Sequence, residues 1–351
     1  MRVLSRRLVS SIALSAAAFG CALASPAAAQ TAEGDQAEDA ERGVGVIVVT
    51  AQKREQDQRD VPLSISTLSS DALAAVQAGG GDIRGLAGRV PNLNIESSFG
   101  RSFPRFYIRG LGNTDFDLNA SQPVSLVYDD VVLENPILKG FPIFDLDRIE
   151  VLRGPQGTLF GRNTPAGIVK FDTVKPGVDG GYAKASWARF NTIQLEGAVG
   201  ANLGNGFSFR ASGFYQHRDH WVDNIDNGAG DDLGGYDDFA GRLQLQYEDG
   251  PLTARLTGQV RVLDGSAILF RANVFQRGSN ELIGLGGPGT EFRRDRIRSD
   301  GINFQELNTY NVGLTVDYDF GPATLTSVTS YWNGNLKSRG DIDGGFGNAF
   351  A

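Results

Sequence analysis

The second half of the chain alternates between apolar and polar residues over long stretches. Residues 193–203, 239–248, 252–262 and 312–320 each keep this alternation for nine or more positions. A period of two is typical of a β-strand with two unlike faces. Strands of soluble sheets average about five or six residues, whereas a tilted strand needs about 9 to 11 to cross a bilayer. The pattern therefore predicts membrane-crossing strands.

The connections between these strands alternate in length. Gly204-Asn205-Gly206, Asp249-Gly250 and Gly321-Pro322 are tight turns, whereas residues 219–235 and 264–306 are long connections. Transmembrane barrels join their strands by short turns on one side and long loops on the other. A soluble β-sandwich imitates the alternation but seldom imitates strand length and loop lengths together. We therefore expect residues 179–351 to be a partial antiparallel β-barrel.

Residues 61–178 predict a compact α+β domain with short elements. Ser69 or Ser70 is the expected cap of one short helix, and Asp82 caps a second that stops before Pro91. Glycine and proline separate the elements throughout. Short strands are predicted at residues 61–67, 106–108, 124–128, 149–152 and 168–172.

The N-terminus predicts a cleaved signal peptide over residues 1–29. Arg2, Arg6 and Arg7 are basic, residues 8–23 are apolar and small, and three alanines follow at 27–29. An uncleaved membrane helix is the alternative, disfavoured because the apolar run is short. The only cysteine, Cys21, lies inside this segment, so we expect the mature protein to have no disulfide.

Residues 30–60 predict a flexible segment that contains one short apolar stretch. The part before Gly43 is acidic and has no aromatic residue, so it cannot bury enough surface to fold. The apolar stretch has two interpretations: a buried strand of the next domain, or an exposed peptide that adds a strand to another protein's sheet. It consists of Val46, Ile47, Val48, Val49, Thr50 and Ala51.

Several motifs closely resemble the plug domain of TonB-dependent receptors. The most specific is residues 145–163, from Asp145 to Asn163, and Tyr107-Ile108-Arg109-Gly110, residues 123–130 and residues 61–65 fit as well. The resemblance covers about residues 47–178, with the motifs in the family's order. One departure is residues 166–169, where many members have a second glycine and an asparagine-containing strand.

The resemblance implies a plug domain followed by the first strands of an incomplete transmembrane β-barrel, in the bacterial outer membrane. Residues 46–51 lie where the family carries its TonB box, which favours the exposed coupling peptide. Partners would be the TonB–ExbB–ExbD complex, outer-membrane lipid and a small solute. The implied function is energy-coupled uptake of a scarce solute, such as a siderophore-iron complex.

Five charged residues of the plug motifs are candidates for ion pairs between plug and barrel. The alternative is that they only pack the plug, because structural ion pairs are common. They are Arg109, Asp130, Glu150, Arg153 and Arg162.

Composition narrows the remaining classes. The formal net charge is −8, which argues against a nucleic-acid partner. With two histidines and one cysteine, the sequence predicts neither a metal site nor a cofactor. We find no set of nucleophile, base and orienting group, so we do not expect an enzyme. A secreted or surface β-rich adhesin is the alternative function. A signalling transducer of the same family needs a further domain before the TonB box, and residues 30–45 are too few and too polar for one.

The first prediction is that signal peptidase cleaves after Ala29, because the small alanines follow the apolar run. Edman sequencing of the membrane-extracted protein should begin at Gln30. A sequence that begins at Met1, or a lipid on Cys21, would contradict it.

The second prediction is that the reading frame continues past codon 351. About seven strands are predicted after Gly181, whereas plugged barrels have about 22. Seven would leave open sheet edges in hydrocarbon, where each unpaired backbone group costs several kcal/mol. Genomic sequencing should find further alternating strands. A stop codon there, together with a heat-modifiable outer-membrane protein of this length, would contradict the expectation.

Overall fold

The computed structural model describes residues 47–69, 72, 73, 76, 82–115, 117, 119–225, 233–271, 293–297, 299, 301–342 and 344. The predicted signal peptide, the flexible segment before residue 46 and Val46 itself lie outside these ranges. Most of the first predicted plug helix does too, and its described residues, Ala72, Leu73 and Val76, are helical.

The plug is built on a five-stranded sheet. β6 (Val124–Tyr128) and β9 (Gly167–Thr173) run parallel, and the other neighbours run antiparallel. Every residue of β6 and β9 is buried, as expected for central strands covered on both faces. In spatial order the strands are β3 (Ser64–Ser69), β8 (Leu146–Arg153), β9 (Gly167–Thr173), β6 (Val124–Tyr128) and β7 (Val131–Leu133).

Shorter elements complete the plug. Asp82 caps η4 (Ile83–Leu86), its carboxylate accepting a hydrogen bond from the backbone N–H of Arg84, so the predicted cap is confirmed. The helix is a 3-10 turn and ends at Leu86. The other short elements are β1 (Val48–Val49), β2 (Gln56–Asp57), η3 (Gln58–Asp60), β4 (Leu93–Glu96), β5 (Arg105–Ile108), η5 (Pro136–Leu138) and α3 (Gly157–Phe160).

The plug sheet has an apolar core on each side. Successive strand residues point to opposite faces, so Leu126 and Val169 join the larger core whereas Val127 and Ile168 join the smaller one. The smaller core also takes in residues that precede the sheet. Its members are Val49, Ala51, Val61, Ile65, Val127, Leu152, Phe160 and Ile168.

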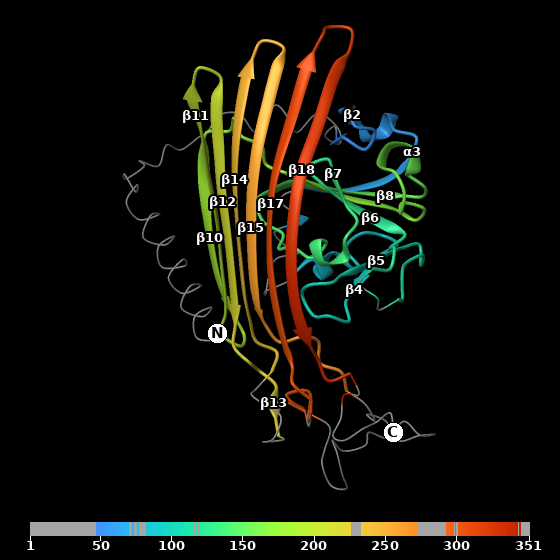
Figure 1. Ribbon diagram of the computed structural model, residues 1–351, viewed down its shortest axis with the longest axis vertical. Helices are drawn as coiled ribbons and strands as arrows, with labels where there is room; N and C mark the ends of the chain where they lie inside the picture. Colours follow the sequence, from blue (N-terminus) through green and yellow to red (C-terminus); the bar gives the residue numbers. More distant parts are fainter. Residues whose placement is uncertain are drawn as a thin grey trace, which may run out of the picture. The chain divides into compact units, whose positions relative to one another are not determined.

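The second half forms a seven-stranded antiparallel sheet, which we call the large sheet (Figure 1). The three predicted tight turns lie at one end of its strands. At the other end, β13 (Asp223–Asn224) and β16 (Arg296–Ile297) join the two long connections as a parallel pair. In order the strands are β10 (Gly180–Ala188), β11 (Thr192–Gly204), β12 (Phe207–Arg218), β14 (Tyr236–Asp249), β15 (Leu252–Gly265), β17 (Phe304–Asp319) and β18 (Thr324–Arg339). Among the described residues, β10 and β18 each have a neighbour on one side only.

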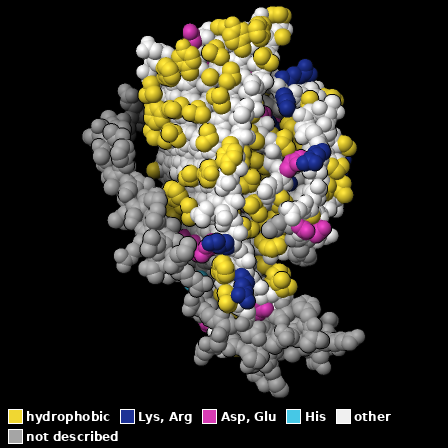
Figure 2. Space-filling model, in the orientation of Figure 1, with side chains coloured by type: hydrophobic (Ala, Val, Ile, Leu, Met, Phe, Trp, Pro, Cys, Tyr) yellow, Lys and Arg dark blue, Asp and Glu magenta, His cyan; other side chains and the backbone are white. Residues whose placement is uncertain are grey.

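The two faces of the large sheet are inverted relative to a soluble protein. Gln216, Asp238 and Gln244 point toward the plug and are 0% exposed. Val199 and Leu243 on the opposite face are each 50% exposed. Hydrophobic side chains gather over this outer face in Figure 2. An apolar outer face and a polar inner face are typical of strands that contact lipid outside and a polar interior inside.

No helix within the residues that the structure describes is long and apolar enough to span a membrane.

Candidate functional site

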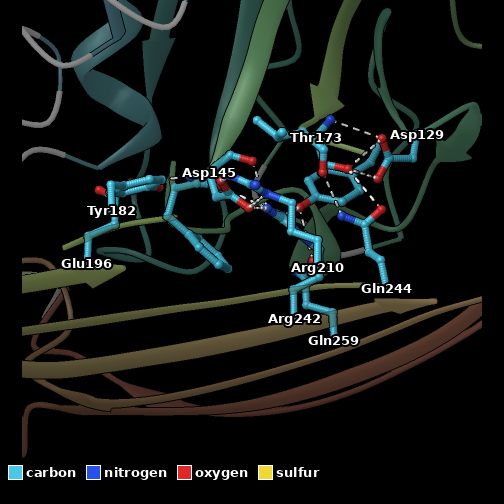
Figure 3. A network of polar contacts seen from close by, with 12 residues as sticks. Asp129, Asp145, Thr173, Tyr182, Glu196, Arg210, Arg242, Gln244 and Gln259 are labelled. Atoms are coloured by element: carbon cyan, nitrogen blue, oxygen red, sulfur yellow. Dashed lines mark hydrogen bonds and ion pairs between the residues drawn. The ribbon is translucent and has the colours of Figure 1, made fainter. Parts of the chain in front are cut away.

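A buried carboxylate fastens the plug to the large sheet. Asp145 immediately precedes β8, and its Oδ2 accepts a hydrogen bond of 2.9 Å from Nε of Arg210 on β12 (Figure 3). Arg242 on β14 approaches the same carboxylate at 3.3 Å. The side chains of Asp145 and Arg242 are 0% exposed and that of Arg210 is 6% exposed. Two guanidinium groups thus offset the cost of burying one carboxylate.

Further hydrogen bonds around this carboxylate join side chains of the large sheet to the plug. Arg242 donates to the hydroxyl of Tyr128 at 2.6 Å and to the main-chain oxygen of Asp145 at 2.8 Å. Burial raises the pKa of Tyr128 to about 12, so the phenol stays protonated. Glu196 on β11 accepts from the backbone N–H of Asp145 at 3.3 Å. We call this set, centred on Asp145, the Asp145 anchor.

A second anchor lies in the loop between β4 and β5. The Arg101 guanidinium is 3.5 Å from Asp238 on β14 and lies over the ring of Tyr236, 4.0 Å from its centroid. Arg261 on β15 binds the same Asp238 carboxylate at 2.9 Å. Arg101 also acts on Asp82, the cap of η4. Burial alone would raise the pKa of the Asp82 carboxyl, but the positive charges of Arg101 and Arg84 outweigh the effect of burial and hold that pKa at about 2.

The predicted coupling segment is docked on the plug. Ile47 and Val48 are 47% and 39% exposed, whereas Val49 and Ala51 are fully buried in the smaller core. Val48 and Val49 pair with β2 in an antiparallel hairpin. The expectation of an exposed peptide is therefore wrong for Val49 and Ala51, because their apolar side chains gain more by burial than by exposure. The buried-strand alternative fits Val49 and Ala51 but not Ile47 and Val48, and the coupling role stays a prediction.

A polar cradle on β8 and β9 holds Thr50 in this docked position. The backbone N–H of Thr50 donates to Glu150 Oε1 at 2.8 Å. Lys170 donates to Thr50 Oγ1 and to Asp172 Oδ1, both at 2.6 Å. Burial raises the pKa of Glu150, and the Thr50 N–H and Lys170 act in the opposite direction.

The five predicted ion-pair residues do not connect the plug to the large sheet within the described part of the chain. Arg153 donates to Ser64 and Ser66 of β3 and to a main-chain oxygen, all within the plug. The Arg162 side chain is 82% exposed and pairs with Glu134 of the plug.

The other three stay within the plug as well. Glu150 belongs to the cradle around Thr50, and Asp130 lies 4.0 Å from Lys170. Arg109 is exposed, with a left-handed φ of 53°. The prediction is wrong in its choice of residues, because the plug meets the large sheet through Tyr128, Asp145 and neighbouring residues rather than through the glycine-rich turns after β8.

The residues that do form the anchors carry a weak signal in the sequence. Arg210, Asp238, Arg242 and Arg261 occupy the polar positions of long alternating strands. A charged side chain in the middle of a membrane-length strand needs a partner, which marks these positions as paired. The alternation does not reveal the partner, because Asp145 lies far away in sequence, 65 residues before Arg210.

Comparison with known proteins agrees with this architecture. The family described as the TonB-dependent receptor plug domain matches residues 57–168. The pesticin receptor of Yersinia pestis is 27% identical over 232 residues, which is 65% of this chain and 32% of that protein. A vitamin B12 transporter, BtuB of Photobacterium profundum, is 26% identical over 226 residues, 58% of this chain and 35% of that protein. The chain thus spans about a third of the length of these curated relatives.

Solved structures share the fold. The ferric yersiniabactin uptake receptor FyuA of Yersinia pestis matches with a TM-score of 0.66 and 20% identity, over 79% of this chain and 41% of that one. The FpvAI–pyocin S2 complex matches with a TM-score of 0.62 and 14% identity, over 81% of this chain and 35% of that one. The plug and the large sheet define the class: residues 57–168 match the plug domain of TonB-dependent receptors, and the chain is similar to TonB-dependent outer-membrane receptors.

The third prediction concerns the Asp145 anchor. Replacing Asp145 by Ala leaves Arg210 and Arg242 buried without a counter-charge, and should weaken the seating of the plug by about 3–5 kcal/mol. Native-state hydrogen exchange of the β8 amides in the folded protein measures the change. Asp147→Ala is the control, because the Asp147 side chain is 54% exposed and contacts Arg148 at the surface. Equal exchange in the two variants would show that the anchor does not hold the plug.

Proposed function

We propose that this protein takes up a scarce solute across the bacterial outer membrane, driven by the TonB–ExbB–ExbD complex. The proposal draws on the relatives, which include an uptake receptor for ferric yersiniabactin and a vitamin B12 transporter. A siderophore-iron complex or another nutrient of similar scarcity is the proposed solute. External residues of the plug and the long connections would bind it.

The observation that carries the proposal is the polar contact between plug and large sheet. Gln244 donates to the main-chain oxygen of Val174 at 2.9 Å, and Tyr128 donates to Gln259 at 3.0 Å. Water can replace such hydrogen bonds when the surfaces separate, at little net cost for each bond. An apolar contact of the same size would lose its whole burial energy. A polar contact thus suits a plug that is seated firmly and displaced repeatedly.

Coupling would act through residues 46–51. In the docked state Val48 and Val49 already pair with β2, so a partner that adds a strand there must first free them. Release would break the Thr50–Glu150 hydrogen bonds and expose Val49 and Ala51. Binding to TonB would have to supply this energy.

The uptake proposal is tested with a deletion strain and its complemented counterpart. Cells are given ⁵⁵Fe-loaded yersiniabactin, ⁵⁵Fe-loaded pyoverdine or ⁵⁷Co-labelled vitamin B12 as separate probes. Uptake of one probe only in the complemented strain, lost when the tonB gene is deleted, supports the proposal. Binding of cells to surfaces without any TonB-dependent uptake would favour the adhesin alternative.

The fourth prediction concerns the coupling segment. Val48→Pro removes a backbone donor and disfavours strand pairing, so uptake should fall to the level of a strain without TonB. Binding of the transported probe at 4 °C and the amount of protein in the outer membrane should not change. Val48→Thr is the control, because threonine keeps the N–H, is β-branched and replaces a half-exposed side chain. Normal uptake by Val48→Pro would exclude residues 46–51 as the coupling segment.

A further inference from the structure

A cavity lies between the plug and the inner face of β15, β17 and β18, and we call it the seam cavity. The register aligns rows of inward-facing residues across these strands, and one row consists of Thr257, Gly313 and Ser330. Their side chains are small or absent, so the sheet does not fill the space in front of the plug. About 350 Å³ is empty there, some of it open to solvent. The plug residues that line the cavity are Tyr128, Asp129 and Val131.

The rows on either side of this one carry buried polar atoms that have no hydrogen-bond partner within the described residues. They are Nε of Arg255, Oδ1 of Asn311 and the indole Nε1 of Trp332, and all three residues line the seam cavity. Arg255 and Asn311 are each 6% exposed. Buried polar atoms in proteins normally have partners, so three around one cavity indicate that something bound there supplies them.

Arg255 differs from the other buried arginines of the large sheet. Arg210 and Arg242 share one aspartate carboxylate, and Arg261 binds another. Arg255 is buried to a similar extent, yet in the described part of the chain it forms neither an ion pair nor a hydrogen bond. A buried guanidinium without a counter-charge is costly, so this position calls for an anion.

Asp129 lines the same cavity but does not neutralise Arg255. Its carboxylate is held by Thr173, whose backbone N–H donates to Oδ1 at 3.0 Å and whose hydroxyl donates to Oδ2 at 2.8 Å (Figure 3). The negative charge of Asp129 repels a second anion from the plug side of the cavity. A bound anion would therefore lie against the large sheet, beside Arg255.

We propose that the seam cavity is a binding site for an anionic oxygen group, a carboxylate or a phosphate, with Arg255 as its charged ligand. A guanidinium presents paired N–H donors that match two oxygens of such a group. The indole N–H of Trp332 and the hydroxyls of Thr257, Thr315 and Ser330 are further donors around the cavity.

The place of the cavity in the fold separates it from the solute site proposed above. Arg255 lies near Leu252, the first residue of β15, on the side of the tight turns (Figure 1). The long connections lie at the opposite end of the strands. The seam cavity is thus a second site, between plug and sheet.

Thiol labelling tests whether the cavity favours anions. Ser330→Cys places a thiol on its wall, and the parent protein gives the background. The full protein, purified from cell membranes in detergent, is treated with a methanethiosulfonate reagent that is either anionic (sulfonatoethyl) or cationic (trimethylammonioethyl). Mass spectrometry gives each rate, which is divided by that reagent's rate with 2-mercaptoethanol. Both reagents attack the same thiolate, so the ratio of the two corrected rates cancels any change in thiol reactivity.

We expect the anionic reagent to be favoured, and Arg255→Gln in the Ser330→Cys protein to lower the ratio about tenfold. Arg255→Lys keeps the charge and should keep most of the preference. Arg339→Gln is the matched control, because it removes an exposed positive charge from β18 and should leave the ratio unchanged. A ratio near one in Ser330→Cys itself, or no change with Arg255→Gln in a protein that stays heat-modifiable, would overturn the proposal.

Competition identifies the anionic group. Sodium acetate or sodium phosphate, compared with sodium chloride at equal ionic strength, should slow labelling of Ser330→Cys by the anionic reagent. The proposal is also wrong if neither salt slows labelling more than chloride does.

Uptake then distinguishes two sources of the anionic group, and this step alone rests on the proposed function. If Arg255→Gln slows uptake of the transported probe while its binding at 4 °C is unchanged, the group belongs to the solute as it passes the plug. If uptake is unchanged, the ligand is a free anion. Labelling requires no transport, so failure of the uptake proposal and failure of the anion site are separate results.

Discussion

The burial of Asp145 between Arg210 and Arg242 is the interaction on which the arrangement of the two halves depends. A lone carboxylate or guanidinium at this depth would be costly, so each half of the chain needs the other to satisfy its charges. The anchor lies where the chain enters β8, the strand next to the edge of the plug sheet. Charge neutralisation thereby fixes the plug next to the apolar contact that Phe144 makes with Phe214 and Ala240.

The polar contacts between plug and large sheet affect how the plug can move. An apolar core is stabilised in proportion to the apolar area that it buries, and separating its parts exposes that area to water. The contact between plug and large sheet has a small apolar cluster of Phe144, Phe214 and Ala240, but it also contains ion pairs, and hydrogen bonds that involve Gln244, Gln259 and Gln305. Specific polar contacts define one position for the plug, and in the proposed displacement water would replace them. The apolar packing inside each half, by contrast, keeps each half intact.

The predicted coupling segment, residues 46–51, also combines apolar burial with polar contacts. Val49 and Ala51 are buried in the smaller core, while Thr50 is bound by a polar cradle that includes Glu150 and Lys170. The segment is short, so its burial involves few side chains. A modest binding energy at the exposed Ile47 and Val48 could therefore compete with it.

The sequence by itself determined the local elements and their class. Strand periodicity, tight turns and the motif over residues 145–163 were enough to predict the plug, the seven long strands and the family, because these features depend on neighbours along the chain. The partners of charged residues were decided only by the tertiary structure. Arg153 and Arg162 proved to pair within the plug, and Asp145 found partners 65 and 97 residues away. Likewise, the hydrophobicity of residues 47–51 suits both a free strand and a buried one. Only the core formed by Leu152, Phe160 and Ile168 offers the surface that makes burial the more stable state.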